Sequence, residues 1–198
     1  MLLAGALTLP AAGQNHIGTI DLQKVFNNYW KRQQGEAALK ERGTAMDKEY
    51  TGFKEDYLKT KDEYTKLMAS AQDQSKTQDE RDKAKTAAES KLLEIKTSEN
   101  TIRTYQENAT TQLDQQKKRM RDSLLQDIYT AINAKAKLNG YTLVIDTAAE
   151  SLNQTPVVLY TGGENDMTDA ILAQLNAGAP ASTPADAPKD SDKKADKK

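Results

Sequence analysis

Apolar and aromatic residues recur at alternating steps of three and four in a long segment without proline, and this repeat constrains the fold most. Counted from Glu36, the steps reach Leu39, Gly43, Met46, Tyr50, Phe53, Tyr57, Thr60, Tyr64, Leu67 and Ala71. Most of these positions are apolar or aromatic, and the alternation does not slip. A seven-residue repeat is typical of a coiled-coil seam rather than of a helix on a broad core. The sequence therefore predicts a long helix from Leu22 to about Ala71.

A second stripe with the same spacing follows further along the chain. Its positions are Leu92, Ile95, Glu99, Ile102, Gln106, Ala109, Leu113, Gln116 and Met120. The helical pattern continues to Leu138, where Asn139-Gly140 predicts a left-handed stop. Between the stripes, residues 69–85 lose the period, which predicts a turn or frayed tip near residues 73–79. One continuous rod is an alternative, but two limbs of similar length favour an antiparallel helical hairpin. The polar residues in the second stripe predict a thin seam.

Short apolar strands are predicted at both ends of this hairpin, at Ile17–Ile20 and Leu143–Ile145. A further apolar run, Val157, Val158 and Leu159, is interpreted as a second strand or an extended segment, and Asp166 as the N-cap of a short last helix. Residues 14–30 and 124–176 would then form a small β-containing body, and residues 31–123 a coiled-coil arm. So small a body buries little apolar area, which predicts oligomerisation. The predicted fold class is α+β. The expected oligomerisation residues are Ile17, Ile20, Leu143, Val144, Ile145, Val157, Val158 and Leu159.

The two ends of the chain differ in composition from the rest. Residues 1–13, MLLAGALTLPAAG, combine an apolar run with small residues after Pro10, as in a secretory signal peptide. We therefore expect export of the chain; a buried N-terminal strand or a mis-assigned start of the chain is the alternative. Residues 177–198 are rich in Pro, Ala, Asp and Lys, a composition that predicts a disordered tail.

The residue inventory argues against an enzyme. The chain has no cysteine and one histidine, His16, so no nucleophile–base pair and no zinc motif can be assembled. Asp21 and Asp146 could form a carboxylate pair if their strands pair, but a helix cap and a strand end are the simpler interpretations. We expect no catalytic residue, no metal and no cofactor.

Lys plus Arg number 28 and Asp plus Glu 29, so the chain has almost no net charge. This balance does not favour binding to nucleic acid. The densest basic cluster consists of Lys117, Lys118, Arg119 and Arg121. It is either a solvated helix face or a contact for anionic clients or acidic headgroups, such as a peripheral membrane or lipopolysaccharide contact.

The amphipathic side chains of the first limb have two interpretations. They either zip the two limbs together or hold another, variable chain, since Tyr and Met adapt to many apolar partners. This candidate client-binding set is Met46, Tyr50, Phe53, Tyr57, Tyr64, Leu67 and Met68.

Two blocks of the sequence resemble a known family. The opening HIGTIDLQKVFNNYWKRQQGEAALKE and the closing YTLVIDTAAESL with VVLYTGGENDMTDAILAQLN are similar to the Skp, or OmpH-like, family of periplasmic chaperones. The resemblance covers roughly residues 14–176. It implies a homotrimer with a small β-body and helical arms that enclose a cavity, where unfolded outer-membrane proteins are held without ATP. The near-neutral charge and the tail depart from the family pattern.

The sequence thus predicts an ATP-independent holdase for outer-membrane proteins. A structural coiled-coil spacer of the cell envelope is the alternative, and a hydrolase would need a constellation of residues that the sequence lacks.

Overall fold

The computed structural model describes residues 16–180. The expected signal peptide, residues 1–13, and residues 181–198 of the expected disordered tail lie outside the described residues. The elements are β1 (Ile17–Ile20), α1 (Leu22–Asn28), α2 (Trp30–Gln72), α3 (Gln78–Leu138), β2 (Leu143–Asp146) and α4 (Thr168–Asn176). The predicted α+β class with a helical hairpin is confirmed.

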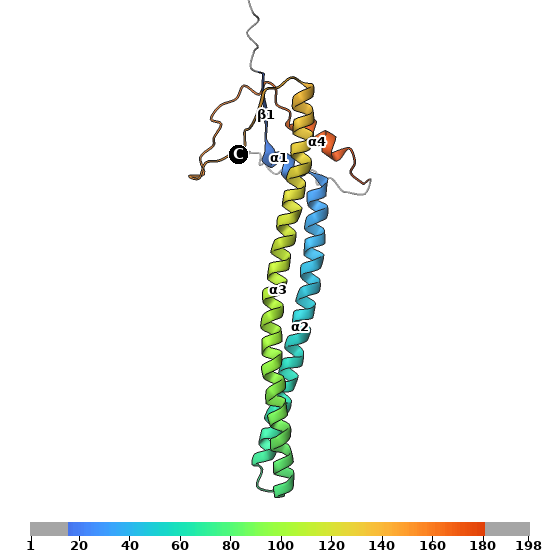
Figure 1. The fold of residues 1–198 in the computed structure, drawn as a ribbon, viewed down its shortest axis with the longest axis vertical. Helices are drawn as coiled ribbons and strands as arrows, with labels where there is room; N and C mark the ends of the chain where they lie inside the picture. Colours follow the sequence, from blue (N-terminus) through green and yellow to red (C-terminus); the bar gives the residue numbers. More distant parts are fainter. Residues whose placement is uncertain (1–15, 181–198) are drawn as a thin grey trace, which may run out of the picture. The chain divides into compact units, whose positions relative to one another are not determined.

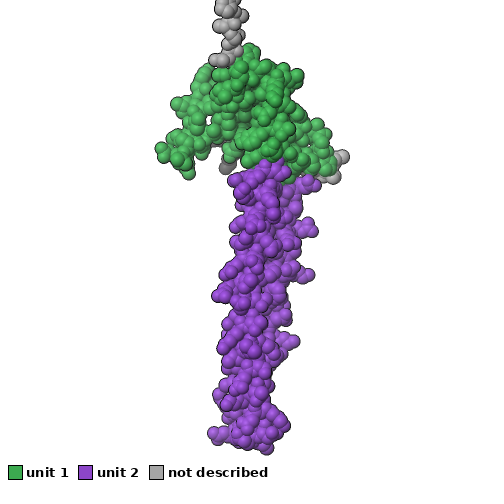
Figure 2. All heavy atoms as spheres, in the orientation of Figure 1, with its two compact units in different colours: residues 1–32, 124–198 green, residues 33–123 purple. Residues whose placement is uncertain are grey.

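The chain divides into two compact units (Figure 2). We call the unit Gln33–Ser123 the arm, and the unit formed by the segments up to Arg32 and from Leu124 onward the body. No helix in residues 16–180 combines the length and the apolar character that a membrane span requires.

In the arm, α2 and α3 run side by side in opposite directions (Figure 1). The stripe predicted for α2 forms its side of the seam: all its positions are buried or half-buried except Phe53, which is 36% exposed. On α3 the most buried arm residues are Ala84, Ala88 and Ile95. Two of the three most buried α3 residues are thus alanines, and the seam is narrow there.

The stripe predicted for α3 is exposed at Leu92, Glu99, Gln106 and Gln116 and buried or half-buried at its other positions. Glu99 and Gln106 are exposed, and Lys91, Ser98 and Tyr105, one residue earlier in each repeat, turn to the seam. Both sets flank the shared positions at steps of three or four, so periodicity alone permits either. Packing against α2 decides between the two sets. Its main consequence is that Tyr105 enters the seam and Gln106 does not.

The turn between α2 and α3 is closely capped rather than frayed. Asp73 Oδ1 accepts a hydrogen bond from the Ser75 amide at 2.9 Å. Thr77 and Glu80 form a capping box, in which Glu80 Oε2 accepts from the Thr77 amide at 2.9 Å and the Glu80 amide donates to Thr77 Oγ1 at 3.4 Å. The motif Thr-x-x-Glu was a sequence signal for this start of α3.

The body is built on a parallel pair of strands, β1 and β2, with Ile17 opposite Leu143 and Ile20 opposite Asp146. Its buried core consists of Ile20, Val25, Tyr29, Leu124, Ile128, Ala131, Ile132, Met167 and Ile171. Gly140, with φ +69°, ends α3 as predicted, because the left-handed conformation suits a residue without Cβ. The core thus joins the strands to one face of α3, to α1 and to α4.

The helix predicted from Leu22 is broken at Tyr29, whose φ of −73° and ψ of 123° are extended. The side-chain amide of Asn176 bridges the break: its nitrogen donates to Asn28 O at 3.0 Å, and its oxygen accepts from the Trp30 amide at 3.0 Å. The break therefore depends on a residue about 150 positions away, which no local pattern of α1 could reveal.

Candidate functional site

The two aspartates that follow the strands act as helix caps. Asp146 Oδ1 accepts hydrogen bonds from the amides of Leu22 and Ala148, each at 3.0 Å, and Asp21 Oδ1 accepts from the Lys24 amide at 2.6 Å. Each carboxylate satisfies amides that the first turn of α1 or the end of β2 leaves without a partner. Among residues 16–180, no group of three or more His, Cys, Asp or Glu side chains is placed to hold a metal ion. The pair is thus explained by capping.

A third aspartate fixes the start of α4. Asp166 Oδ1 accepts from the Thr168 amide at 2.8 Å and from the Thr168 hydroxyl at 2.5 Å, and that hydroxyl in turn accepts from the Asp21 amide at 2.8 Å. The N-cap position is therefore Met167 rather than the predicted Asp166, which lies one residue earlier and connects the first turn of α4 to the end of β1.

The basic cluster on α3 is partly neutralised by one residue that the sequence analysis passed over. Asp122 accepts from Lys118 Nζ at 2.7 Å and lies 3.7 Å from Arg121 Nη2. The hydrogen bond from Lys118 holds the pKa of the Asp122 carboxyl below its usual range, so it stays ionised. All these side chains are solvated, and such pairs contribute little to stability. Lys117 and Arg119 are exposed beside them.

The body leaves much apolar surface uncovered. Of the expected oligomerisation residues, Ile20 is buried, Val144, Ile145 and Val158 are half-buried, and Ile17, Leu143, Val157 and Leu159 are exposed. Leu159 is 88% and Tyr160 87% exposed. The predicted strand at Val157–Leu159 does not form: Pro156 makes an isolated bridge to Glu150, the Val157 amide donates to Ala149 O at 2.8 Å, and Val158–Tyr160 pair with neither strand. Exposed apolar side chains on an unpaired segment are typical of a surface that another chain covers.

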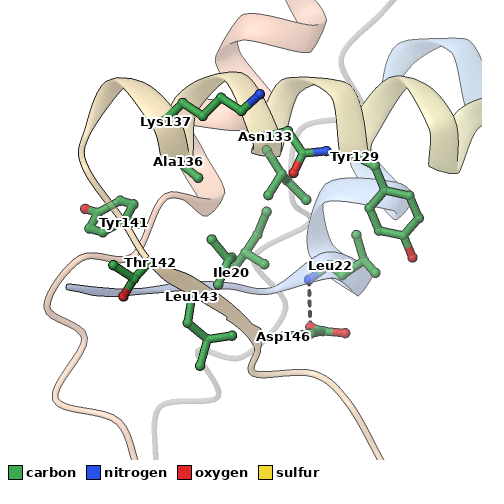
Figure 3. A pocket seen from close by; sticks show the side chains of 12 residues that line it. Ile20, Leu22, Tyr129, Asn133, Ala136, Lys137, Tyr141, Thr142, Leu143 and Asp146 are labelled. Atoms are coloured by element: carbon green, nitrogen blue, oxygen red, sulfur yellow. Dashed lines mark hydrogen bonds between the residues drawn. The ribbon is translucent and has the colours of Figure 1, made fainter. Parts of the chain in front are cut away.

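A groove of about 550 Å³ lies between the sheet and the last turns of α3 (Figure 3). Tyr129, Asn133 and Lys137 line it from the helix, and Leu143 and Asp146 from β2. The hydrogen bond from the Leu22 amide to Asp146 joins two residues that line the groove, as the dashed line in Figure 3 shows. The groove is amphipathic, and it is continuous with the exposed Leu143.

In the arm, the predicted client-binding residues divide into two groups. Met46 is buried in the seam, Tyr50, Tyr57, Tyr64 and Leu67 are half-buried there, and Met68, which lies off the stripe, is also half-buried. Phe53 packs edge-on against Tyr105, with ring centroids 5.1 Å apart, and the Tyr57 hydroxyl donates to Glu99 at 3.0 Å. These aromatics therefore connect the two helices.

Tyr105 is the seam residue that the sequence analysis missed. Its hydroxyl lies 2.8 Å from Glu49 Oε2 and 3.2 Å from Met46 O, and partial burial together with Glu49 raises its pKa. Two grooves of about 230 and 210 Å³ flank Met46 and Tyr105, one on each side of the seam. The small neighbouring residues Gly43 and Ala109 leave this level of the arm thinly filled.

The arm also carries apolar side chains outside the seam that were not predicted. Leu58 on α2 is 58% exposed, and Leu93 on α3 is 68% exposed, with Leu92 beside it less so. They lie among charged residues that balance in sign. A sequence signal existed for Leu58 and Leu93, which fall off the heptad stripe, where a plain coiled coil would carry polar residues. Leu92 was predicted as the first seam position of the second stripe and is exposed instead.

The comparison with known families agrees with this architecture. The family model described as OmpH, outer membrane protein (OmpH-like), matches residues 16–175. A search of curated proteins found no significant match. OmpH-like proteins are in general periplasmic chaperones of outer-membrane proteins and are not known as enzymes. Since the match covers both strands, the arm and α4, the chain belongs to the OmpH-like family.

Proposed function

We propose that this protein is an ATP-independent periplasmic holdase, which binds unfolded outer-membrane proteins and prevents their aggregation. One observation carries the proposal: the arm exposes Leu58, Leu92 and Leu93 on a long, solvated surface. Scattered apolar side chains among charges suit many weak contacts with chains of variable sequence. The seam aromatics keep the helices together, and the exposed leucines contact the client.

The active form is a homotrimer, assembled through the body. The exposed residues Leu143, Val157 and Leu159 support this assembly, since a monomer would leave them in water. The segment 158–160, which pairs with neither strand, offers backbone groups to a strand of another copy. The trimer brings three arms around a common cavity, where a client is shielded from other clients.

The basic residues Lys117, Lys118, Arg119 and Arg121 are a secondary contact for lipopolysaccharide or acidic headgroups. Because Asp122 neutralises part of the cluster, this contact is weak and strongly dependent on salt. A liposome flotation assay with and without lipopolysaccharide, at low and at physiological salt, measures it.

The central experiment is suppression of aggregation. A urea-denatured outer-membrane β-barrel protein is diluted into buffer with the chain, and light scattering is followed while native mass is measured in parallel. Suppression by a trimer supports the holdase. A well-folded oligomer without suppression would reject the holdase in favour of a structural spacer of the envelope, and a monomer at micromolar concentration would reject the trimer.

The contact surface is tested by a triple variant, Leu58→Gln, Leu92→Gln and Leu93→Gln. Glutamine is a good helix former, so the arm should fold. Partial loss of three leucine contacts should weaken holding by roughly tenfold. The matched control is Lys59→Gln with Glu89→Gln, which alters exposed positions of the same helices without a change in net charge. Equal holding by both variants would show that the leucines do not contact clients.

A further inference from the structure

A second groove in the body, of about 530 Å³, has no role in the proposed holding of clients. Tyr29, Trp30 and Lys31 line it from the α1–α2 break, Asp127 and Ala131 from α3. Leu175 and Gly178 line it from α4 and the residues that follow. The groove therefore lies where the break, α3 and the end of α4 meet within one unit.

Its aromatic wall is held in place by hydrogen bonds. The rings of Tyr29 and Trp30 stand nearly perpendicular, at 85° with centroids 6.3 Å apart. The Tyr29 hydroxyl lies 3.0 Å from Asp127 Oδ2, and the Trp30 amide donates to Asn176. Trp30 itself is only half-buried. A preformed aromatic wall of this kind is what proline-rich segments bind, because their extended helix loses little entropy on docking.

The chain continues from the rim of this groove. α4 ends at Asn176, Gly178 lines the groove, and the sequence then reads APASTPADAP, with prolines at 180, 184 and 188. Residues 181–188 carry one charge, Asp186, whereas residues 189–198 are mostly charged. The charges that line the groove are balanced too, since Lys31 Nζ forms an ion pair with Asp127 at 2.7 Å. A nearly neutral, proline-containing sequence therefore follows directly after a residue that lines the groove.

We propose that residues 181–188 of this chain's own tail dock as a proline-rich strap into the groove lined by Tyr29 and Trp30. The prolines pack on the half-buried ring of Trp30, against which the buried Tyr29 packs edge-on, and the strap covers the end of α4 and the α1–α2 break. The connection is short, so the docking needs little intrinsic affinity. With an effective concentration in the millimolar range, a segment that binds with a Kd of about 1 mM is docked in roughly half of the molecules or more.

The test uses Trp30, the only tryptophan of the chain, as its own reporter. Quenching of its fluorescence by acrylamide is compared between the full chain and a chain that ends at Pro180. Removal of the strap should raise the quenching constant by about 1.5- to 2-fold, as expected for a site that is half or more occupied. The same rise is expected for the full chain with Pro184→Ala and Pro188→Ala. A synthetic peptide of residues 179–198 at millimolar concentration should reverse the rise in the shortened chain.

The matched control is Lys193→Ala with Lys194→Ala, which changes the charged end of the tail and leaves the prolines. It should quench like the full chain; a rise equal to that of the proline variant would show that charge, not proline packing, holds the tail. Equal quenching of the full and shortened chains would overturn the proposal. Protection that disappears on dilution would assign the groove to a second copy instead, and would overturn it as well.

Discussion

The closeness of the two arm helices can be tested by the same substitution at two glycines of α2. A Cβ built at Gly35 would overlap Sδ of Met120 and lie 2.8 Å from its Cγ, whereas a Cβ at Gly52 meets nothing within 4 Å. Glycine inside a helix costs about 0.5–1 kcal/mol relative to alanine, so Gly52→Ala should stabilise the arm by that amount. Gly35→Ala should gain the same helix stabilisation, but its new Cβ must displace the Met120 side chain.

The magnitude of the clash sets the expected sign. Overpacking costs about 1–3 kcal/mol, and the flexible methionine places this case in the lower half of that range. Gly35→Ala should therefore be neutral or destabilising by about 1 kcal/mol, while Gly52→Ala stabilises. For a chain of this size, each kcal/mol shifts the Tm by roughly 2–4 °C, so the two variants should differ by several degrees.

The assay is thermal and urea unfolding followed by helical circular dichroism, at one protein concentration because oligomers unfold in a concentration-dependent manner. Met120→Ala should reverse the cost of Gly35→Ala in a double-mutant cycle, since it removes Sδ and Cγ. If Gly35→Ala stabilises as much as Gly52→Ala, the helices are not in contact at this level and the argument fails.

Three further predictions concern the body. Asp146→Ala should lower the free energy of unfolding by about 1–2 kcal/mol, whereas Asp146→Asn, which keeps an accepting oxygen, should cost less in the same urea titration. Lys31, which donates to Asp127, holds the pKa of that carboxyl below its usual range. A lowered carboxyl pKa adds stability above the unfolded pKa and loses it as pH falls through the folded pKa. Asp127→Asn should therefore flatten the acid limb of stability against pH, and an unchanged limb would refute this. Asn176→Ala should cost about 1–3 kcal/mol and shift the emission of Trp30, because the break loses both bonds. An unaltered emission would count against the bridge.

Much of the fold followed from local patterns. The strand Ile17–Ile20, the start of β2 at Leu143 and the stop at Gly140 agree with their predictions, because alternation, apolar runs and left-handed glycine depend on near neighbours in the chain. The α2 side of the seam was also predicted from a local pattern, because its aromatic residues recur on one stripe of the helix.

The functional surfaces could be predicted less well from local sequence patterns. The aromatics of α2 were visible in the sequence, but their contacts with Glu99 and Tyr105 were not. The exposure of Leu58 and Leu93 could have been inferred from their place off the stripe, yet hydrophobicity alone favours burial.

The sequence by itself determined that this chain forms two long helices with a strand at each end, since helical and strand periods are properties of adjacent residues. Only the tertiary structure decided that Tyr105 rather than Gln106 enters the seam, because two stripes one residue apart are equivalent until a partner helix selects one. It also decided the break at Tyr29, because Asn176, which bridges it, comes from the far end of the chain. Contacts between distant residues depend on the assembled fold, and no local period encodes them.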